Sequence, residues 1–252
     1  MAKRQTSHVP SARRPPPGAA IANRLLAALA SEEYARLSPD IDIVPFPLKE
    51  ILHKPGEAIR HVYFPSSGFA SVLTVLEDGG MVEVATIGRE GMVGISAVLD
   101  VGPSPSTALV QAESDACYRI NTESFRDEMS RNGHFARLVT RYAHALVGVI
   151  MQSTACNAVH SVEQRLARWL LLAHDRVERD DFPLTQEFVA MMLGTTRPTV
   201  TIVAGVLQRA GLITYHRGHV TIFDRERLEA ASCECYRVTT QLLKGVFAAK
   251  AR

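Results

Sequence analysis

The stretch Leu184–Phe223, LTQEFVAMMLGTTRPTVTIVAGVLQRAGLITYHRGHVTIF, decides the fold of this chain. Its first part predicts a helix, because apolar residues recur at helical spacing after Thr185, a residue type that caps helix N-termini. Gly194 follows where a tight turn between two helices needs a positive φ. Small and apolar residues fall at the remaining positions of a helix-turn-helix: Ala190, Val200 and Val203. The alternative is a generic helical hairpin packed on a strand pair, which the agreement of these positions disfavours.

The second part of the stretch predicts a recognition helix followed by a two-stranded wing. Thr196 can cap the helix, and Pro198 is tolerated in its first turn, where N–H groups have no internal partners. An Arg in that turn can bind guanine or phosphate, and a hydroxyl at a helix N-terminus can bind phosphate. Arg217-Gly218 joins the strands 212–216 and 219–223 and gives the wing a basic tip. We therefore expect DNA contacts from eight residues: Thr185, Gln186, Thr196, Arg197, Thr199, Thr201, His216 and Arg217.

The distribution of charge is more informative than its total. The chain has 252 residues and a formal net charge of +2. Acidic residues outnumber Lys and Arg fourteen to six between Asp40 and Ser130, whereas basic residues lead nine to five from Leu184 onward. An acidic first part and a basic last part fit a nucleic-acid-binding region at the end of the chain. Residues 1–20 are basic and rich in Pro, and we expect a disordered arm.

Composition also indicates whether the protein spans a membrane, where in the cell it resides and whether it depends on disulfide bonds. The mean hydropathy is near zero and there is no long uncharged apolar run, so we expect no membrane-spanning helix and no membrane partner. The N-terminus lacks an apolar signal core, which predicts a cytoplasmic protein. Four Cys at wide spacing do not indicate a secreted disulfide framework.

Residues 41–120 change to short strands separated by turns. Asp78-Gly79-Gly80, between alternating apolar runs, is a strong hairpin signal. Several antiparallel strands at this spacing predict a small jelly-roll-like barrel, preceded by two short helices over 23–29 and 32–37. The clearest strands are Ile59–Phe64, Phe69–Leu76, Met81–Ile87, Thr107–Glu113 and Ala116–Ile120.

A long helix is predicted after Gly133. From Phe135 onward, apolar residues alternate at spacings of three and four over three heptads, which predicts a two-stranded coiled coil. The expected dimer seam is Leu138, Tyr142, Ala145, Val149, Gln152 and Cys156. A second stripe of Val139, Leu146 and Ile150 can pack on the barrel. The alternative is a core helix without a partner. Another amphipathic helix follows over 161–177.

This order of elements resembles the Crp/Fnr superfamily of bacterial transcription regulators. Several local runs carry the resemblance beside the helix-turn-helix: Val62-Tyr63-Phe64-Pro65, Ile87-Gly88-Arg89-Glu90-Gly91-Met92-Val93-Gly94 and Ser161-Val162-Glu163-Gln164-Arg165-Leu166-Ala167-Arg168-Trp169-Leu170. The resemblance implies an α+β fold with a jelly-roll, cyclic-nucleotide-binding-like barrel, a dimerisation helix and a winged helix-turn-helix. The domains would be a basic arm (1–20), a sensory barrel (21–130), a dimerisation helix (131–158) and a DNA-binding domain (159–252). The implied partners are a second copy of the chain, double-stranded DNA with a two-fold-related operator, and RNA polymerase.

The sequence departs from the cyclic-nucleotide-binding relatives at the effector site. Those relatives supply a Glu for the ribose hydroxyls and an Arg for the phosphate, roles that need a carboxylate and a guanidinium. Met92 and Ser106 stand at the matching positions and can do neither. We expect an effector pocket near Gly91, Met92, Ser106 and Thr107 that does not bind cyclic AMP in the usual mode. The effector itself is unknown.

No cofactor or metal is predicted from the cysteines and histidines. The N-terminal arm has no Cys for an oxygen-sensing iron–sulfur cluster. Cys156 lies on the expected seam, where it is either a reduced small apolar residue or half of an interchain disulfide. Cys233 and Cys235 are expected on one helix capped by Asp224. One intervening residue then places them about 200° apart, so both cannot bind one metal without local unwinding.

Two functions remain open from the sequence, and neither is enzymatic. The first is a homodimeric, sequence-specific DNA-binding transcription regulator whose barrel receives a signal. The alternative is an effector-binding barrel protein whose helix-turn-helix mainly contacts another protein. Ile202 supports the alternative, because it stands where relatives place a base-reading side chain. A metalloenzyme is disfavoured, since no set of ligands or activated nucleophile is visible.

Overall fold

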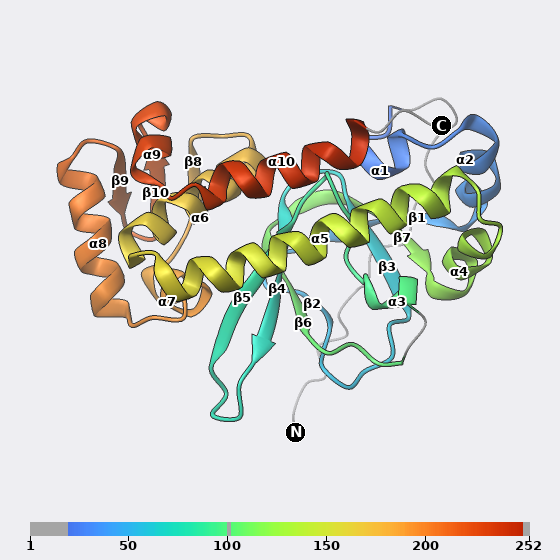
Figure 1. Ribbon diagram of the computed structural model, residues 1–252, viewed down its shortest axis with the longest axis horizontal. Coiled ribbons are helices and arrows are strands. Elements are labelled where there is room, and N and C mark those ends of the chain that lie inside the picture. Colours follow the sequence, from blue (N-terminus) through green and yellow to red (C-terminus); the bar gives the residue numbers. More distant parts are fainter. Residues whose placement is uncertain (1–19, 100–101, 249–252) are drawn as a thin grey trace, which may run out of the picture.

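Two antiparallel sheets form the N-terminal half of the protein in this computed structural model, which describes residues 20–99 and 102–248 (Figure 1). Large side chains between the sheets, among them Phe46, Phe64 and Ile120, are fully buried or nearly so. The predicted barrel of short antiparallel strands is therefore confirmed. One sheet has the order β1-β7-β3 (Ile41–Phe46, Ser114–Asn121, His61–Pro65) and the other β2-β6-β4-β5 (Ile51–His53, Thr107–Ala112, Phe69–Val75, Met81–Ile87).

Short helices close the barrel at its ends. The Asn23 side chain accepts from the amides of Leu25 and Leu26 at the start of α1 and donates to the carbonyls of Pro65 and Gly91. One buried amide thus caps a helix and fixes it to the barrel. The helices of this half are α1 (Arg24–Ala27), α2 (Ser31–Leu37), the 3-10 turn η1 (Ser38–Asp40), α3 (Ser96–Leu99) and α4 (Thr122–Ser130). The predicted arm, residues 1–20, lies outside the described residues except for Ala20.

The long helix α5 (His134–Val159) packs its apolar face on its own chain. Leu138, Tyr142, Ala145 and Val149 are buried in one core with barrel residues and with side chains of the last helix. Gln152 donates to the Cys235 thiol, and Cys156 contacts Cys233. These six residues are therefore not the solvent-facing seam that the heptad pattern predicts. The heptad pattern of α5 is present, but its packing partner is the rest of the same chain.

That partner includes α10 (Cys235–Ala248), which runs back along α5 toward the barrel (Figure 1). Gly148 lets the two helices approach, since a Cβ at this position would lie 3.2 Å from a methyl group of Leu242. At the far end of α10, the Arg24 guanidinium lies 4.3 Å from the centre of the Phe247 ring. The first and last described helices of the chain therefore touch.

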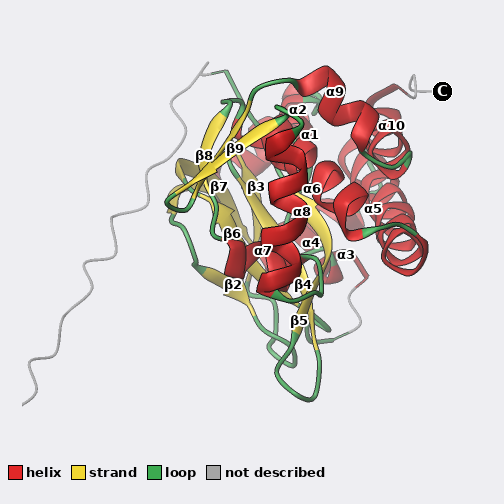
Figure 2. Cartoon of the chain, turned by 90° about the vertical axis from the view of Figure 1, so that its left-hand side faces the viewer, coloured by secondary structure: helices red, strands yellow, loops and turns green. Residues whose placement is uncertain are grey.

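The remaining elements form the C-terminal domain, shown end-on in Figure 2. The helix α6 (Val162–Val177) begins at a capping box made by Ser161 and Gln164. Around it lie β8 (Asp181–Pro183), α7 (Gln186–Met192), α8 (Arg197–Arg209), β9 (Ile213–His216), β10 (His219–Ile222) and α9 (Arg225–Ala231), with the strands in the order β8-β10-β9. The third strand, β8, is not among the strands expected from the sequence.

Within the described residues, no single helix has the length and apolar character needed to cross a membrane. One bent pair, α7 with α8, passes that test only when the two helices are taken together.

Candidate nucleic-acid interface and its connection to the barrel

The two helices α7 and α8 meet at an angle of 104° around Gly194, whose φ is +57°. Thr185 caps α7 by accepting from the amide of Phe188, and Thr196 caps α8 by accepting from the amide of Thr199. Val189 and Val200 are fully buried where the helices cross. The caps, the turn glycine and the core residues of the predicted helix-turn-helix are all confirmed.

An open groove runs between the starts of α7 and α8 and the wing. It brings together four of the eight predicted DNA-contacting residues: Thr185, Gln186, Arg197 and Arg217. The Arg197 side chain is 67% exposed, and its nearest acidic group, on Glu187, lies 4.0 Å away. An ion pair this long and exposed is weak, so the guanidinium can turn to another partner.

The other predicted contacts lie around this groove. Thr201 donates to the Gln186 side chain at 2.7 Å and is exposed on α8, while Thr199 is half-buried against Thr196. His216 and Arg217 are exposed at the tip of the wing. The part that each plays in DNA binding stays a prediction.

Residues that the sequence did not single out extend the same surface. A second hollow along α8 is lined by Gln186, Thr201, Gln208, Arg209 and Tyr215. The Tyr215 hydroxyl donates to the carbonyl of Leu184, so it fixes the wing to the start of the helix-turn-helix. A basic residue in the last turn of α8 was visible in the sequence; the position of Tyr215 depends on how the wing folds back.

The turn of the helix-turn-helix contacts the barrel directly. A Cβ added at Gly194 would lie 3.1 Å from a methyl group of Val82, a residue of β5. Next to it, Glu83 accepts a 2.9 Å hydrogen bond from Trp169 Nε1 on α6 and another from the Ser71 hydroxyl. Burial raises the pKa of Glu83 to about 7 against the hydrogen bonds that lower it. The barrel and the DNA-binding domain thus share a buried carboxyl.

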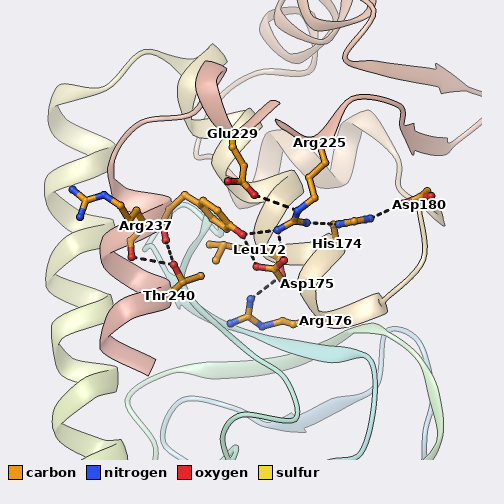
Figure 3. A network of polar contacts seen from close by, with 10 residues as sticks. Leu172, His174, Asp175, Arg176, Asp180, Arg225, Glu229, Arg237 and Thr240 are labelled. Carbon is orange, nitrogen blue, oxygen red and sulfur yellow. Dashed lines mark hydrogen bonds and ion pairs between the residues drawn. The ribbon is translucent and has the colours of Figure 1, made fainter. Parts of the chain in front are cut away.

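A polar network braces the rest of this junction (Figure 3). Arg225 of α9 pairs with Asp175 of α6 at 2.6 Å and donates to the Tyr236 hydroxyl of α10. Tyr236 in turn donates to Asp175 at 2.9 Å. Arg176, buried beside them, pairs with Glu90 of the barrel at 2.6 Å. The network holds three helices of the C-terminal domain and one barrel loop in a single arrangement.

The residues predicted to form an effector pocket have other surroundings. Met92 is fully buried and its carbonyl accepts from the Tyr142 hydroxyl, while a Cβ at Gly91 would lie 2.3 Å from the same hydroxyl oxygen. Gly91 and Met92 therefore face the long helix of their own chain, not an open pocket. Ser106 and Thr107 lie at the start of β6, and their part in effector binding stays a prediction. These four residues offer neither a carboxylate nor a guanidinium, and the expectation that cyclic AMP does not bind in the usual mode stays a prediction.

A third face of α5 is exposed to solvent, whereas Val139 and Leu146 of the predicted second stripe are buried in the core that contains barrel residues. On the side away from the core, exposed residues recur at spacings of four and three: Thr140, His144, Val147, Met151, Thr154 and Ala158. The two largest apolar side chains among them, Val147 and Met151, are 55% and 68% exposed. This is the spacing of a helix-pairing seam.

The cysteines near the C-terminus converge, contrary to the sequence prediction. Asp224 does cap a helix, but that helix, α9, ends at Ala231, and Cys235 begins a new helix, α10. Because the chain turns between the two helices, both Cys233 and Cys235 reach Cys156 and His160 at the end of α5. The assumption of one continuous helix was wrong.

Comparisons with known proteins agree with this architecture. Residues 43–132 match the family model of the cyclic nucleotide-binding domain, and residues 164–231 match that of the Crp-like helix-turn-helix domain. No curated protein matches the sequence.

Solved structures of several regulators share the fold at low identity. A transcriptional regulator of the crp/fnr family from Eubacterium rectale is 19% identical with a TM-score of 0.66, over 82% of this chain and 97% of its own. The global regulator CLP from Xanthomonas campestris is 15% identical with a TM-score of 0.61, over 77% and 99%. A CRP-family regulator from Thermus thermophilus is 22% identical with a TM-score of 0.60, over 76% and 98%.

A cyclic-nucleotide-binding-type barrel joined to a Crp-like helix-turn-helix defines a class of transcription regulators that combine an effector domain with a DNA-binding domain. The chain belongs to the Crp/Fnr family.

Proposed function

We propose that the protein binds a two-fold-related DNA operator as a homodimer, with the start of α8 in the major groove of each half-site. The observation that carries the proposal is Arg197, the first residue of α8, which stands exposed at an open groove beside the basic tip of the wing. A guanidinium at that place can bind guanine O6 and N7. The caps Thr185 and Thr196 offer hydroxyls to phosphates at two helix N-termini.

Ile202 stands in the recognition helix where relatives place a base-reading side chain. Its side chain lies on the exposed side of α8 and is 67% exposed. An apolar side chain there can contact the C5-methyl group of thymine, so exposure of Ile202 also fits DNA binding. The same exposure would suit a protein partner, and the experiment below separates the two.

The proposed dimer contact is the exposed stripe of α5 that contains Val147 and Met151. Its opposite face is already occupied by the barrel and α10. Two copies joined along this stripe would carry their recognition helices as a two-fold-related pair, which is what a two-fold-related operator requires. RNA polymerase as a further partner rests on the family resemblance.

We further propose that the barrel receives a signal other than cyclic AMP bound in the usual way. The chemical misfit of Met92 and Ser106 and the contact of Tyr142 with Gly91 support this. The similar regulator from Xanthomonas campestris is described as c-di-GMP responsive. Both cyclic AMP and c-di-GMP therefore belong among the ligands to be tested for a change in DNA affinity.

The proposal is tested by selecting genomic fragments that the purified protein retains, followed by measurement of affinity against salt. We expect a shared motif with two-fold symmetry and a log–log salt slope of about −0.9 for each phosphate contact. Retention of no motif above random sequence, together with specific capture of one protein through α8, would favour the alternative of a protein-binding helix-turn-helix.

A further inference from the structure

Four metal-binding side chains meet at the junction of α5 and α10. The donor atoms of Cys156, His160, Cys233 and Cys235 all lie within 4.8 Å of one another. The sulfurs of Cys156 and Cys233 are 3.5 Å apart, and the Cys235 sulfur is 3.6 Å from Nδ1 of His160. All three cysteines are buried and none is in a disulfide bond.

Two features of the backbone create this cluster. Cys156 and His160 are four residues apart at the end of α5, so their side chains lie on one face. Cys233 precedes α10 and Cys235 is its first residue, which frees the pair from the helical spacing that would separate them. Neither DNA binding nor the contact of the barrel with the helix-turn-helix uses these four residues.

These two distances are close to those around a tetrahedral zinc ion. Zinc binds Cys sulfur at about 2.3 Å and His nitrogen at about 2.0–2.1 Å, which in a tetrahedron separates two sulfurs by about 3.8 Å and sulfur from nitrogen by about 3.6 Å. Three Cys and one His complete four-coordination and leave no position for water. We propose that Cys156, His160, Cys233 and Cys235 form a closed, structural Zn²⁺ site.

The surroundings supply partners to these ligands. Nε2 of His160 lies 3.2 Å from the Glu234 carboxylate, a contact that holds the proton on Nε2 and leaves Nδ1 to bind metal. The Gln152 amide donates to the Cys235 sulfur at 3.0 Å. Hydrogen-bond partners of this kind orient metal ligands.

The charge of the filled site is also matched. Binding Zn²⁺ releases the three thiol protons to solvent, and three thiolates with one Zn²⁺ leave a net charge of −1. Arg165 and Arg168 interact electrostatically with Cys156, and both are more than nine-tenths buried. Nε of each has no hydrogen-bond partner in the structure. Two buried cations beside the cluster favour an anionic centre over three neutral thiols.

Other thiol chemistry explains less of the geometry. A disulfide between Cys156 and Cys233 would leave Cys235, His160 and their partners without a role. In a 4Fe–4S cluster each protein ligand binds a different iron, and in a 2Fe–2S cluster each iron holds two of the four ligands, so both clusters need donor atoms spread more widely than these. A zinc ion uses all four residues, and it would tie the end of α5 to the start of α10.

The test is the metal content of the full-length protein, purified without a histidine tag under reducing conditions. We expect about one zinc ion per chain, and nearly complete loss of zinc in Cys235→Ser and in His160→Gln. Cys117→Ser is the matched control, because Cys117 is a buried free thiol of the barrel outside the cluster. Equal zinc in Cys235→Ser and Cys117→Ser would overturn the proposal.

Wild-type protein alone provides a second test, in case the variants do not fold. Exchange of zinc for Co²⁺ should give the visible bands of tetrahedral cobalt and a sulfur-to-cobalt charge-transfer band, and chelation should lower the Tm and raise the count of reactive thiols. Folded, reduced protein that holds iron in place of zinc, or that takes up neither zinc nor Co²⁺, would overturn the proposal. This result does not depend on whether the protein binds DNA.

Discussion

Trp169 donates a 2.9 Å hydrogen bond from its indole nitrogen to Glu83, and this bond joins the first helix of the DNA-binding domain to the edge strand of the barrel. Both side chains are buried. The strand residue before Glu83 is Val82, which lies against the turn of the helix-turn-helix at Gly194. A displacement of β5 would therefore reach the turn between α7 and α8 through two adjacent contacts.

The raised pKa of Glu83 predicts that this junction is sensitive to pH. The pKa is about 7 in the folded protein and 4.5 as an ordinary carboxyl, so the folded state binds the proton more tightly. The protonated Glu83 carboxyl therefore contributes its full stabilisation of the fold below about pH 4.5, and this contribution is lost as the pH rises through about 7. The shift corresponds to roughly 3 kcal/mol. Glu83→Gln should remove this part of the pH dependence.

The measurement is the Tm from pH 5 to pH 8. Wild type should lose stability across this range relative to Glu83→Gln, whereas Glu77→Gln, a change of an exposed carboxyl in the β4–β5 hairpin, should follow wild type. Parallel curves for wild type and Glu83→Gln would show that the carboxyl is ionised without cost.

Replacement of Arg197 by Ala should abolish specific retention of the operator and leave the oligomeric state unchanged. Loss of a bidentate contact to guanine costs about 1–3 kcal/mol of discrimination. Fluorescence anisotropy with the selected operator and with random DNA measures the difference. Arg227→Ala, on α9, is the matched control, since its guanidinium is also largely exposed. Wild-type affinity of Arg197→Ala for the operator would remove this residue from the interface.

A charge at the exposed stripe of α5 should separate the subunits. Met151→Asp places a carboxylate in the proposed contact between two copies, whereas Leu99→Asp, at an exposed leucine of α3, should not affect association. Light scattering should give the monomer mass for Met151→Asp and the dimer mass for wild type and Leu99→Asp. A dimer that persists in Met151→Asp would place the contact elsewhere.

Two Gly→Ala substitutions should change stability in opposite directions. At Gly91 the added methyl would overlap the Tyr142 ring, which we expect to cost about 1–3 kcal/mol. At Gly245, inside α10, nothing lies within 4 Å of the added methyl, and the better helix propensity of Ala should stabilise by up to about 1 kcal/mol. Urea unfolding measures both. A neutral Gly91→Ala would mean that Tyr142 moves aside easily and that space for a ligand can open there.

The sequence predicts local features of this molecule well and long-range ones poorly. The helix-turn-helix follows from caps, a turn glycine and spacing that lie within a few residues of one another, and its caps at Thr185 and Thr196 form as expected. The dimer seam of α5 is different, because the apolar pattern does not reveal that both of its stripes pack on the chain itself. The packing depends on α10, which returns along α5 from about 90 residues further on.

The cysteine cluster was missed for a related reason. A cap at Asp224 and apolar residues beyond it suggest one helix, but α9 ends after seven residues. The break brings together residues that are 77 positions apart, Cys156 and Cys233. The spacing of Cys156 and His160, four residues apart, was a signal in the sequence that could have prompted the search for further ligands.

The return of α10 along α5 gives the DNA-binding domain two connections to α5 and α1, in addition to its side-chain contacts with the barrel. One is the chain itself at His160–Ser161, and the other is a helix whose far end holds Phe247 against Arg24. A domain attached at one point can reorient in any direction. A domain that is also held by a second helix, parallel to the first, can rotate about fewer axes. Reorientation of α8 should therefore require sliding or release of α10, so proteolytic removal of the chain beyond Thr239 is expected to widen the range of domain motion.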